Sequence, residues 1–174
     1  MKIFKNTSIS KNYKNSVIAI GNFDGIHAGH KKVLKAALKK AKKLKKKFGL
    51  LTFEPVPVMF FNKEIINHRL DTLPQKIYNL KKEKLDFVII QKFNKRFSKL
   101  SYQDFIYKVL YKKIKCNYLY VSKNFKFGKK RKGDVSKLKI FEKKYFFKTI
   151  ITPPLKKKKK TISSTIIRKY LKSG

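Results

Sequence analysis

Residues 21–30, with the sequence GNFDGIHAGH, combine glycines, an acidic residue and two histidines just before an amphipathic segment. Gly21 and Gly25 allow the backbone to turn sharply and let a ligand approach the main chain. The N–H groups at the start of the following helix, with the positive end of its dipole, would form an anion site. His27 and His30 stand three positions apart, so both imidazoles can project over one turn and donate hydrogen bonds to phosphate oxygens. The stretch therefore predicts a phosphate-binding turn.

Two histidines at this spacing could instead ligate a metal or serve only the packing of the helix. Zinc needs a third protein ligand, and the other soft candidates, His68 and Cys116, lack motif spacing. We therefore predict no metal site built from side chains. Cys116 is the only cysteine of the sequence, so an intrachain disulfide is impossible and a reducing compartment fits.

Short apolar runs typical of buried parallel strands alternate with amphipathic helical segments along the chain. The expected strands are 17–20, 49–53, 86–90, 117–121 and 145–151. The expected helices run from His30 to about Lys47, over 71–82, from Ser101 onward and from Ser163 or Ser164 onward. This alternation predicts an α/β fold in which helices flank a parallel sheet of about five strands. In such sheets ligands bind beyond the carboxyl ends of the strands, where the 21–30 turn would lie.

Lysine dominates the charge of the chain, which has 174 residues and a formal net charge of +38. Lysine clusters can bind nucleic-acid phosphates by counterion release, but drift in an A/T-rich genome explains the lysine excess equally simply. We favour drift and expect at most weak, non-specific binding of nucleic acid. No stretch approaches the ~20 apolar residues that span a bilayer. The N-terminus also lacks the apolar core of a secretory signal, so we predict a cytoplasmic protein that does not contact membranes.

The 21–30 stretch resembles the signature of the HxGH nucleotidyltransferase superfamily. In detail it is similar to the GNFDGxHxGH motif of the FMN adenylyltransferase module of bacterial bifunctional FAD synthetases, with every fixed position present. Further segments resemble motifs of that family in the same order, namely 52–57 (TFEPVP), 69–70 (RL), 93–105 (FNKRFSKLSYQDF), 124–134 (NFKFGKKRKGD) and 163–168 (SSTIIR). The similarity extends from about Val17 to Leu171. Val56, Ser122 and Lys123 depart from the family pattern, which leaves an inactive relic of the family as an alternative.

This resemblance implies a Rossmann-like nucleotidyltransferase fold and a single FMN adenylyltransferase domain over residues 1–174, without the riboflavin kinase domain of most bacterial relatives. The implied reaction transfers the AMP moiety of ATP to FMN, giving FAD and pyrophosphate, by in-line attack without a covalent enzyme intermediate. Catalysis would then depend on positioning and on charge stabilisation. ATP and FMN are the implied substrates, and Mg²⁺ is the implied cofactor, held mostly by the ATP phosphates and water. The oligomeric state is not predicted.

The resemblance also assigns roles to individual residues. The implied catalytic residues are His27, His30 and Arg168. The implied ATP-binding residues are Gly21, Asn22, Phe23, Asp24, Gly29, Ser163, Ser164 and Thr165. The implied flavin-binding residues are Asn124, Phe53, Phe105 and Phe127. The alternative roles are helix capping for the hydroxyl side chains, ordering of the turn for Asp24, and core packing for the phenylalanines.

Two other functional classes stay open at the level of sequence. Another adenylyl- or cytidylyltransferase of the superfamily would share the two histidines, although the NFDG and NFKFG segments argue against it. A basic nucleic-acid-binding module on the same scaffold would fit the charge, but the sequence contains no recognised RNA- or DNA-binding motif.

Overall fold

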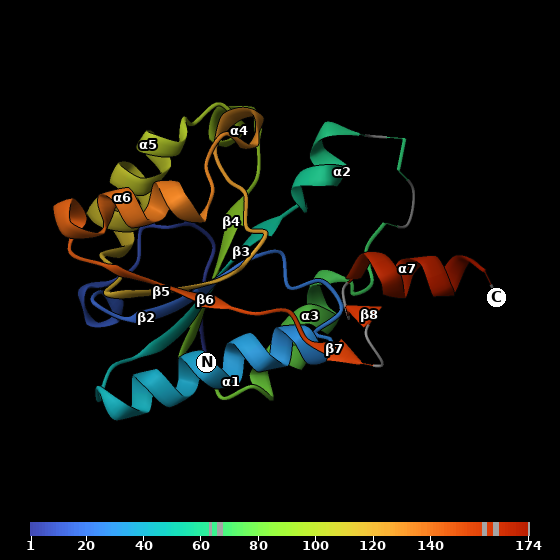
Figure 1. The fold of residues 1–174 in the computed structure, drawn as a ribbon, viewed down its shortest axis with the longest axis horizontal. Coiled ribbons are helices and arrows are strands. Elements are labelled where there is room, and N and C mark those ends of the chain that lie inside the picture. The colour runs from blue at the N-terminus through green and yellow to red at the C-terminus, as the bar shows by residue number, and fades with distance from the viewer. Residues whose placement is uncertain (63, 66–67, 158–159, 162–163, 174) are drawn as a thin grey trace.

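The computed structural model describes residues 1–62, 64–65, 68–157, 160–161 and 164–173. Its centre is a sheet of parallel strands in the order β1-β4-β3-β2-β5-β6 (Figure 1). These strands are β1 (Lys2–Phe4), β2 (Val17–Ile20), β3 (Phe48–Glu54), β4 (Phe87–Lys92), β5 (Tyr118–Ser122) and β6 (Lys148–Thr152). A separate antiparallel pair consists of β7 (Lys156–Lys157) and β8 (Lys160–Thr161).

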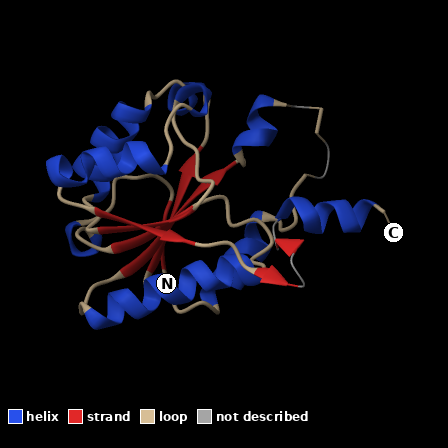
Figure 2. Cartoon of the chain, viewed as in Figure 1, coloured by secondary structure: helices blue, strands red, loops and turns tan. Residues whose placement is uncertain are grey.

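Helices cover both faces of the sheet (Figure 2). They are η1 (Lys11–Tyr13), α1 (Ala28–Lys43), α2 (Pro57–Phe61), α3 (Leu73–Lys81), α4 (Lys95–Ser98), α5 (Tyr102–Asp104), η2 (Phe105–Ile114), η3 (Lys129–Arg131), α6 (Val135–Tyr145) and α7 (Ser164–Lys172). In Figure 1, α1 and α3 lie below the sheet, whereas α4, α5 and α6 lie above it. Within the described part of the chain, no helix is long and apolar enough to cross a membrane.

Alternate residues of β2 belong to the two halves of the core. Ile18 and Ile20 pack in one buried cluster with side chains from η2 and α6, whereas Val17 and Ala19 pack in the other with side chains from α1. Successive side chains of a strand point to opposite faces of its sheet. An unbroken apolar run is therefore what a strand requires when helices cover it on both sides.

The expected α/β architecture is confirmed, and the sheet has one strand more than the five expected. The extra strand, β1, lies at the edge of the sheet and pairs with β4. It has three residues, which are too few to show the alternation of apolar and polar residues that identifies a strand. The last expected strand, 145–151, begins later, at Lys148. The reason is that α6 runs to Tyr145 and ends at Phe146, whose φ of 54° is left-handed.

The carboxyl ends of β2, β3 and β5 lie at one edge of the sheet. The turn after β2, the segment after β3 and the loop after β5 all leave from this edge, and α7, red in Figure 1, lies beyond it. The winding of the chain thus brings together segments that are far apart in the sequence, and these segments carry most of the predicted site residues.

Candidate active site

The turn between β2 and α1 leaves its backbone donors without main-chain partners. In the described part of the chain, the N–H groups of residues 22–29 make no hydrogen bond to another main-chain atom. Phe23 and Gly25 have positive φ angles of 46° and 68°, which curl the turn over the start of the helix. A Cβ on Gly25 would lie 2.6 Å from Cδ1 of Leu70, so only glycine fits there. The turn therefore presents a row of N–H donors at the positive end of a helix, which is an arrangement suited to phosphate.

The two histidines stack on each other at the start of α1. Their ring centroids are 3.8 Å apart, and the Phe23 ring lies 4.8 Å from the His30 ring. His27 is the N-cap of the helix, and its Nδ1 accepts a hydrogen bond of 3.3 Å from the N–H of His30. Because Nδ1 is the acceptor, the proton of a neutral His27 is on Nε2.

Burial lowers the pKa of both histidines. The pKa of His30 falls to about 3, because burial disfavours its charged form and His27 adds repulsion, while Asp24 opposes the shift. The pKa of His27 is also lowered, again mainly by burial. Both imidazoles are therefore largely neutral at pH 7. The Nδ1 atom of His30 is buried and has no hydrogen-bond partner in the described residues.

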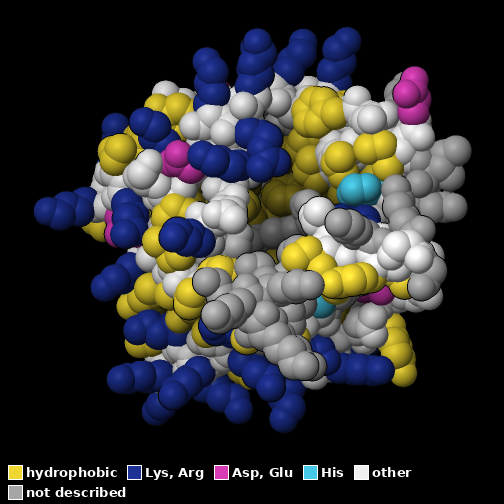
Figure 3. Space-filling model, turned by 45° about the vertical axis from the view of Figure 1, so that its right-hand side comes forward, with side chains coloured by type: hydrophobic (Ala, Val, Ile, Leu, Met, Phe, Trp, Pro, Cys, Tyr) yellow, Lys and Arg dark blue, Asp and Glu magenta, His cyan; other side chains and the backbone are white. Residues whose placement is uncertain are grey.

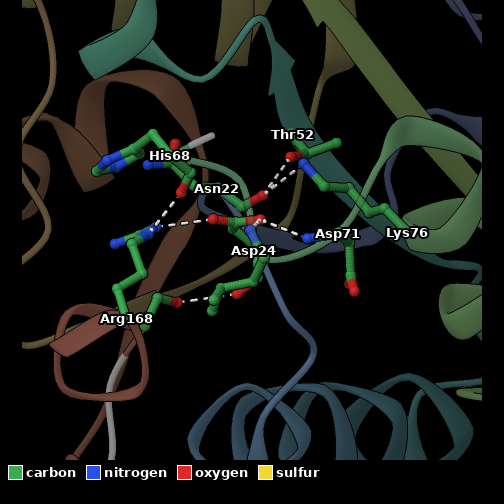
Figure 4. Close-up of polar contacts among 9 residues, drawn as sticks. Asn22, Asp24, Thr52, His68, Asp71, Lys76 and Arg168 are labelled. Carbon is green, nitrogen blue, oxygen red and sulfur yellow. Dashed lines mark hydrogen bonds and ion pairs between the residues drawn. The ribbon is translucent and has the colours of Figure 1, made fainter. Parts of the chain in front are cut away.

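Asp24 connects the turn to the segment that precedes α3. Its carboxylate is buried, and Oδ1 accepts hydrogen bonds from the N–H groups of Leu70 and Asp71, at 2.9 and 3.2 Å (Figure 4). These two bonds fix the segment against the turn. These contacts are those expected if Asp24 orders the turn, which is one of the alternatives considered from the sequence.

The same carboxylate binds the last helix of the chain. Oδ2 of Asp24 forms an ion pair with Nη2 of Arg168 at 2.7 Å, and Nε of Arg168 donates to the carbonyl oxygen of His68 at 2.7 Å. Ser164 Oγ donates to the carbonyl oxygen of Asp24 at 2.8 Å. α7 also borders a pocket of about 410 Å³, which Gly25 lines from the turn. These contacts place α7 directly beside the predicted phosphate site.

Two side chains to which the sequence analysis gave no role bind the backbone of the turn. Lys76 Nζ and Thr52 Oγ1 both donate to the carbonyl oxygen of Asn22, at 3.1 and 2.8 Å (Figure 4). Lys76 is only 2% exposed, and burial lowers its pKa. A signal did exist in the sequence, because Lys76 occupies the helical face that Leu73 and Leu80 define, where an apolar residue is expected.

The three predicted flavin-site phenylalanines lie in one buried aromatic cluster. Phe97 links Phe53 and Phe105 at centroid distances of 5.8 and 6.1 Å, and Phe105 lies 5.2 Å from Phe127. Figure 3 brings the carboxyl edge of the sheet forward and shows a hollow there with hydrophobic side chains at its bottom. Asn124 is exposed in the turn that follows β5.

The comparisons with known proteins bear on the whole of this arrangement. A family model described as FAD synthetase matches residues 9–166. The chain belongs to the FAD synthetase family. The match covers the turn, the histidine pair, the aromatic cluster and Ser164.

Three curated relatives share the same protein name. A "Bifunctional riboflavin kinase/FMN adenylyltransferase" of Buchnera aphidicola subsp. Schizaphis graminum is 40% identical over 94% of this chain and 53% of its own length. Proteins of the same name are 37% identical in Buchnera aphidicola subsp. Acyrthosiphon pisum, over 98% of this chain and 55% of theirs, and 33% identical in Escherichia coli K12, over 89% and 50%. The chain thus spans about half the length of the curated relatives it matches.

Solved structures support the fold of this FAD synthetase family member. A crystal structure of a protein named as a macrolide-efflux protein from Streptococcus pneumoniae superposes with a TM-score of 0.80 at 26% identity, over 97% of this chain and 56% of the other. A pantoate-beta-alanine ligase from Francisella tularensis superposes with a TM-score of 0.61 at 17% identity, over 97% and 73%. The second likeness concerns the fold alone.

Of the other residues compared with the FAD synthetase family, three are exposed and one is buried. Thr165 is exposed at the start of α7, and Ser163 lies outside the described residues. Val56, one of the three departures from the family pattern, is buried as the N-cap of α2. Ser122 and Lys123 are exposed at the end of β5. In the part of the chain that is described, no three His, Cys, Asp or Glu side chains cluster as a metal site would require.

Proposed function

We propose that this chain transfers the AMP moiety of ATP to FMN, giving FAD and pyrophosphate. The observation that carries the proposal is the turn 22–29, whose N–H groups have no main-chain partner among the described residues. A stacked, neutral histidine pair lies at its end, in a chain of the FAD synthetase family. The name of the relatives, which includes FMN adenylyltransferase, supports the choice of substrates. Cytoplasmic location stays a prediction from the sequence.

The chemistry needs no protein nucleophile. A phosphate oxygen of FMN would attack the α-phosphorus of ATP as the bond to the bridging oxygen of the β-phosphate breaks, and pyrophosphate would leave. The backbone donors of the turn and the positive end of the α1 dipole would stabilise the charge that develops on the phosphates. His27 would donate from Nε2, because its Nδ1 already accepts the N–H of His30.

Arg168 would act from α7. In the structure, two of its donors bind Asp24 and the carbonyl of His68, and a guanidinium has further N–H groups with which to bind a phosphate oxygen. We propose that Ser164 and Thr165 bind phosphate at the start of the same helix, alongside Ser163. We propose Gly21, Asn22, Phe23, Asp24 and Gly29 as the residues that shape the nucleotide side of the site.

The flavin would bind in the hollow at the carboxyl edge of the sheet, beside the aromatic cluster. We propose that Phe53, Phe105 and Phe127 provide its apolar wall and that Asn124 contacts the polar edge of the ring system. A flat aromatic ligand gains contact area from such a wall without a charged partner.

Mg²⁺ is expected to accompany ATP. Both carboxylate oxygens of Asp24, the acidic side chain of the turn, already bind Arg168 and the 70–71 backbone. The donor set therefore fits an ion held by phosphates and water rather than by protein ligands. Bound there, Mg²⁺ would neutralise charge on the leaving pyrophosphate.

Incubation of the purified protein with FMN, ATP and Mg²⁺, followed by chromatography, tests the proposal through the appearance of FAD. CTP in place of ATP tests the competing cytidylyltransferase function. Riboflavin in place of FMN should give no product, because the proposal assigns adenylyl transfer alone to these 174 residues. Absence of FAD from a folded protein that binds ATP would contradict the proposal.

A further inference from the structure

Two side chains from different elements bind one main-chain oxygen of the phosphate turn. Lys76 of α3 and Thr52 of β3 donate to the carbonyl of Asn22 at 3.1 and 2.8 Å (Figure 4). A carbonyl oxygen has two lone pairs, so these two donors satisfy it and fix the direction of the C=O bond.

The direction of this carbonyl fixes a donor on the other side of the peptide. The peptide joining Asn22 to Phe23 is trans, and in a trans peptide the C=O and N–H bonds point in opposite directions. The N–H of Phe23 therefore points away from Lys76 and Thr52. It makes no hydrogen bond to the described part of the chain. The φ of 46° at Phe23 is uncommon for a residue other than glycine, so the surrounding contacts must maintain this peptide orientation.

Lys76 is a costly residue for mere packing. Its side chain is almost fully buried, and an ammonium group in the interior is tolerated only with partners. The carboxylates of Glu54, Asp24 and Asp71 attract its charge, although Glu54 also forms an ion pair with Arg69. Among the residues that the structure describes, Lys76 makes one hydrogen bond, to the carbonyl oxygen of Asn22. The directional contact of this cation is therefore with the turn, which points to a role there.

We propose that Lys76 is a positioning residue of the nucleotide site: together with Thr52 it holds the Asn22 carbonyl inward, and thereby aims the Phe23 N–H at a phosphate of ATP. The inference rests on the proposed function and adds the two side chains that keep this donor in place. Lys76 acts through the backbone and need not touch the nucleotide.

Lys76→Met, which removes the ammonium group and leaves an unbranched apolar side chain, is the main test. Lys81→Met is its control because Lys81 is exposed on the same helix. We expect Lys76→Met to lower kcat/KM for ATP about 10- to 100-fold, the effect of losing one hydrogen bond to a charged group. KM for FMN should stay unchanged, and so should all constants of Lys81→Met. Lys76→Arg, which retains a donor, should recover part of the loss.

Thr52→Val supplies a second route to the same carbonyl. It should also lower kcat/KM for ATP, and the double variant Lys76→Met/Thr52→Val should lose less than the product of the single losses, because both act on one peptide. Unchanged ATP kinetics in a folded Lys76→Met protein would overturn the inference. If that variant does not fold, unchanged ATP kinetics in both Lys76→Arg and Thr52→Val would overturn it.

The same variants separate this inference from the proposed function. If the parent protein makes no FAD, the proposed function fails, and calorimetric titration of each variant with ATP then decides the inference by affinity alone. Weaker ATP binding in Lys76→Met than in Lys81→Met supports it, and equal binding overturns it.

Discussion

Asp24 and Arg168 form an ion pair at 2.7 Å although 144 residues separate them in the chain. Asp24 belongs to the turn after the central strand, and Arg168 belongs to the last helix. The pair thus connects the two motifs that the sequence analysis assigned to phosphate binding, and it makes the placement of α7 dependent on one buried carboxylate.

Asp24→Asn should therefore destabilise the fold. Removing one partner of a buried pair leaves the other charge uncompensated, and Arg168 still keeps some contact with water. We expect the free energy of unfolding to fall by about 2–3 kcal/mol, as measured by urea denaturation. Lys108→Met, which removes the surface pair Lys108–Asp104, is the control and should leave stability nearly unchanged. Equal stability of Asp24→Asn and the parent would show that the pair contributes nothing.

His27→Ala and Arg168→Ala should each lower kcat by about 100-fold, the equivalent of about 2.7 kcal/mol of transition-state stabilisation. The reason is that both would donate to phosphate oxygens as charge develops. Lys35→Ala, an exposed position on the helix that carries both histidines, is the control. Steady-state formation of FAD measures all three. Parent-like turnover in both site variants would refute the role assigned to the turn and α7.

The stability of the protein should depend on His30 in the acid range. Its pKa is about 3 in the folded state against 6.5 when unfolded, so only the unfolded chain takes up a proton between these values. Stability due to His30 is therefore complete above pH 6.5 and is lost as the pH falls toward 3. Between pH 6.5 and 4.5, the parent should lose about 2 kcal/mol more than His30→Gln in urea unfolding. Parallel pH profiles for the two proteins would mean that His30 titrates normally.

Gly25→Ala should weaken both the fold and the binding of ATP. The φ of 68° disfavours alanine, and the new Cβ would lie 2.6 Å from Leu70 Cδ1. We expect a loss of about 1–3 kcal/mol in the free energy of unfolding. The double variant Gly25→Ala/Leu70→Ala removes the contact with Cδ1 but keeps the backbone strain and the 2.8 Å approach to Leu70 Cβ. The difference between its urea midpoint and that of Leu70→Ala alone measures these two effects together, and a zero difference would contradict the prediction.

The predicted part of the structure is the part that local sequence determines. The apolar run VIAI predicts a strand because both faces of that strand are buried. The apolar stripe of α1 predicts a helix because only one face of that helix is buried. β1 was not predicted, because a strand this short is defined by its pairing with β4 and not by a pattern of its own residues. The helix α6, with lysines throughout and Leu138 as its one fully buried residue, carries too weak a stripe to be recognised.

The candidate site divides in the same way. The turn and its histidine pair are contiguous in the sequence, so their chemistry could be predicted from residue types and spacing. The contacts of Asp24 with Arg168 and of Lys76 with Asn22 join residues from separate elements, and no periodicity encodes them. Only the apolar positions around Lys76 gave a signal, since a lysine among them must find a partner inside the protein.

The strand order β1-β4-β3-β2-β5-β6 has a consequence for how this scaffold can change its specificity. Chain winding proceeds outward from β2 in one direction to β3 and β4, and then resumes on the other side with β5 and β6. The connections that follow β2 and β5 therefore run to opposite sides of the sheet. The space between them at the carboxyl ends of these strands results from the strand order itself. In the proposed function the β2 turn holds the nucleotide, and the loop after β5 carries Asn124 and Phe127 of the flavin side. Exchange of that loop would therefore change two of the four proposed flavin contacts and leave the nucleotide side intact.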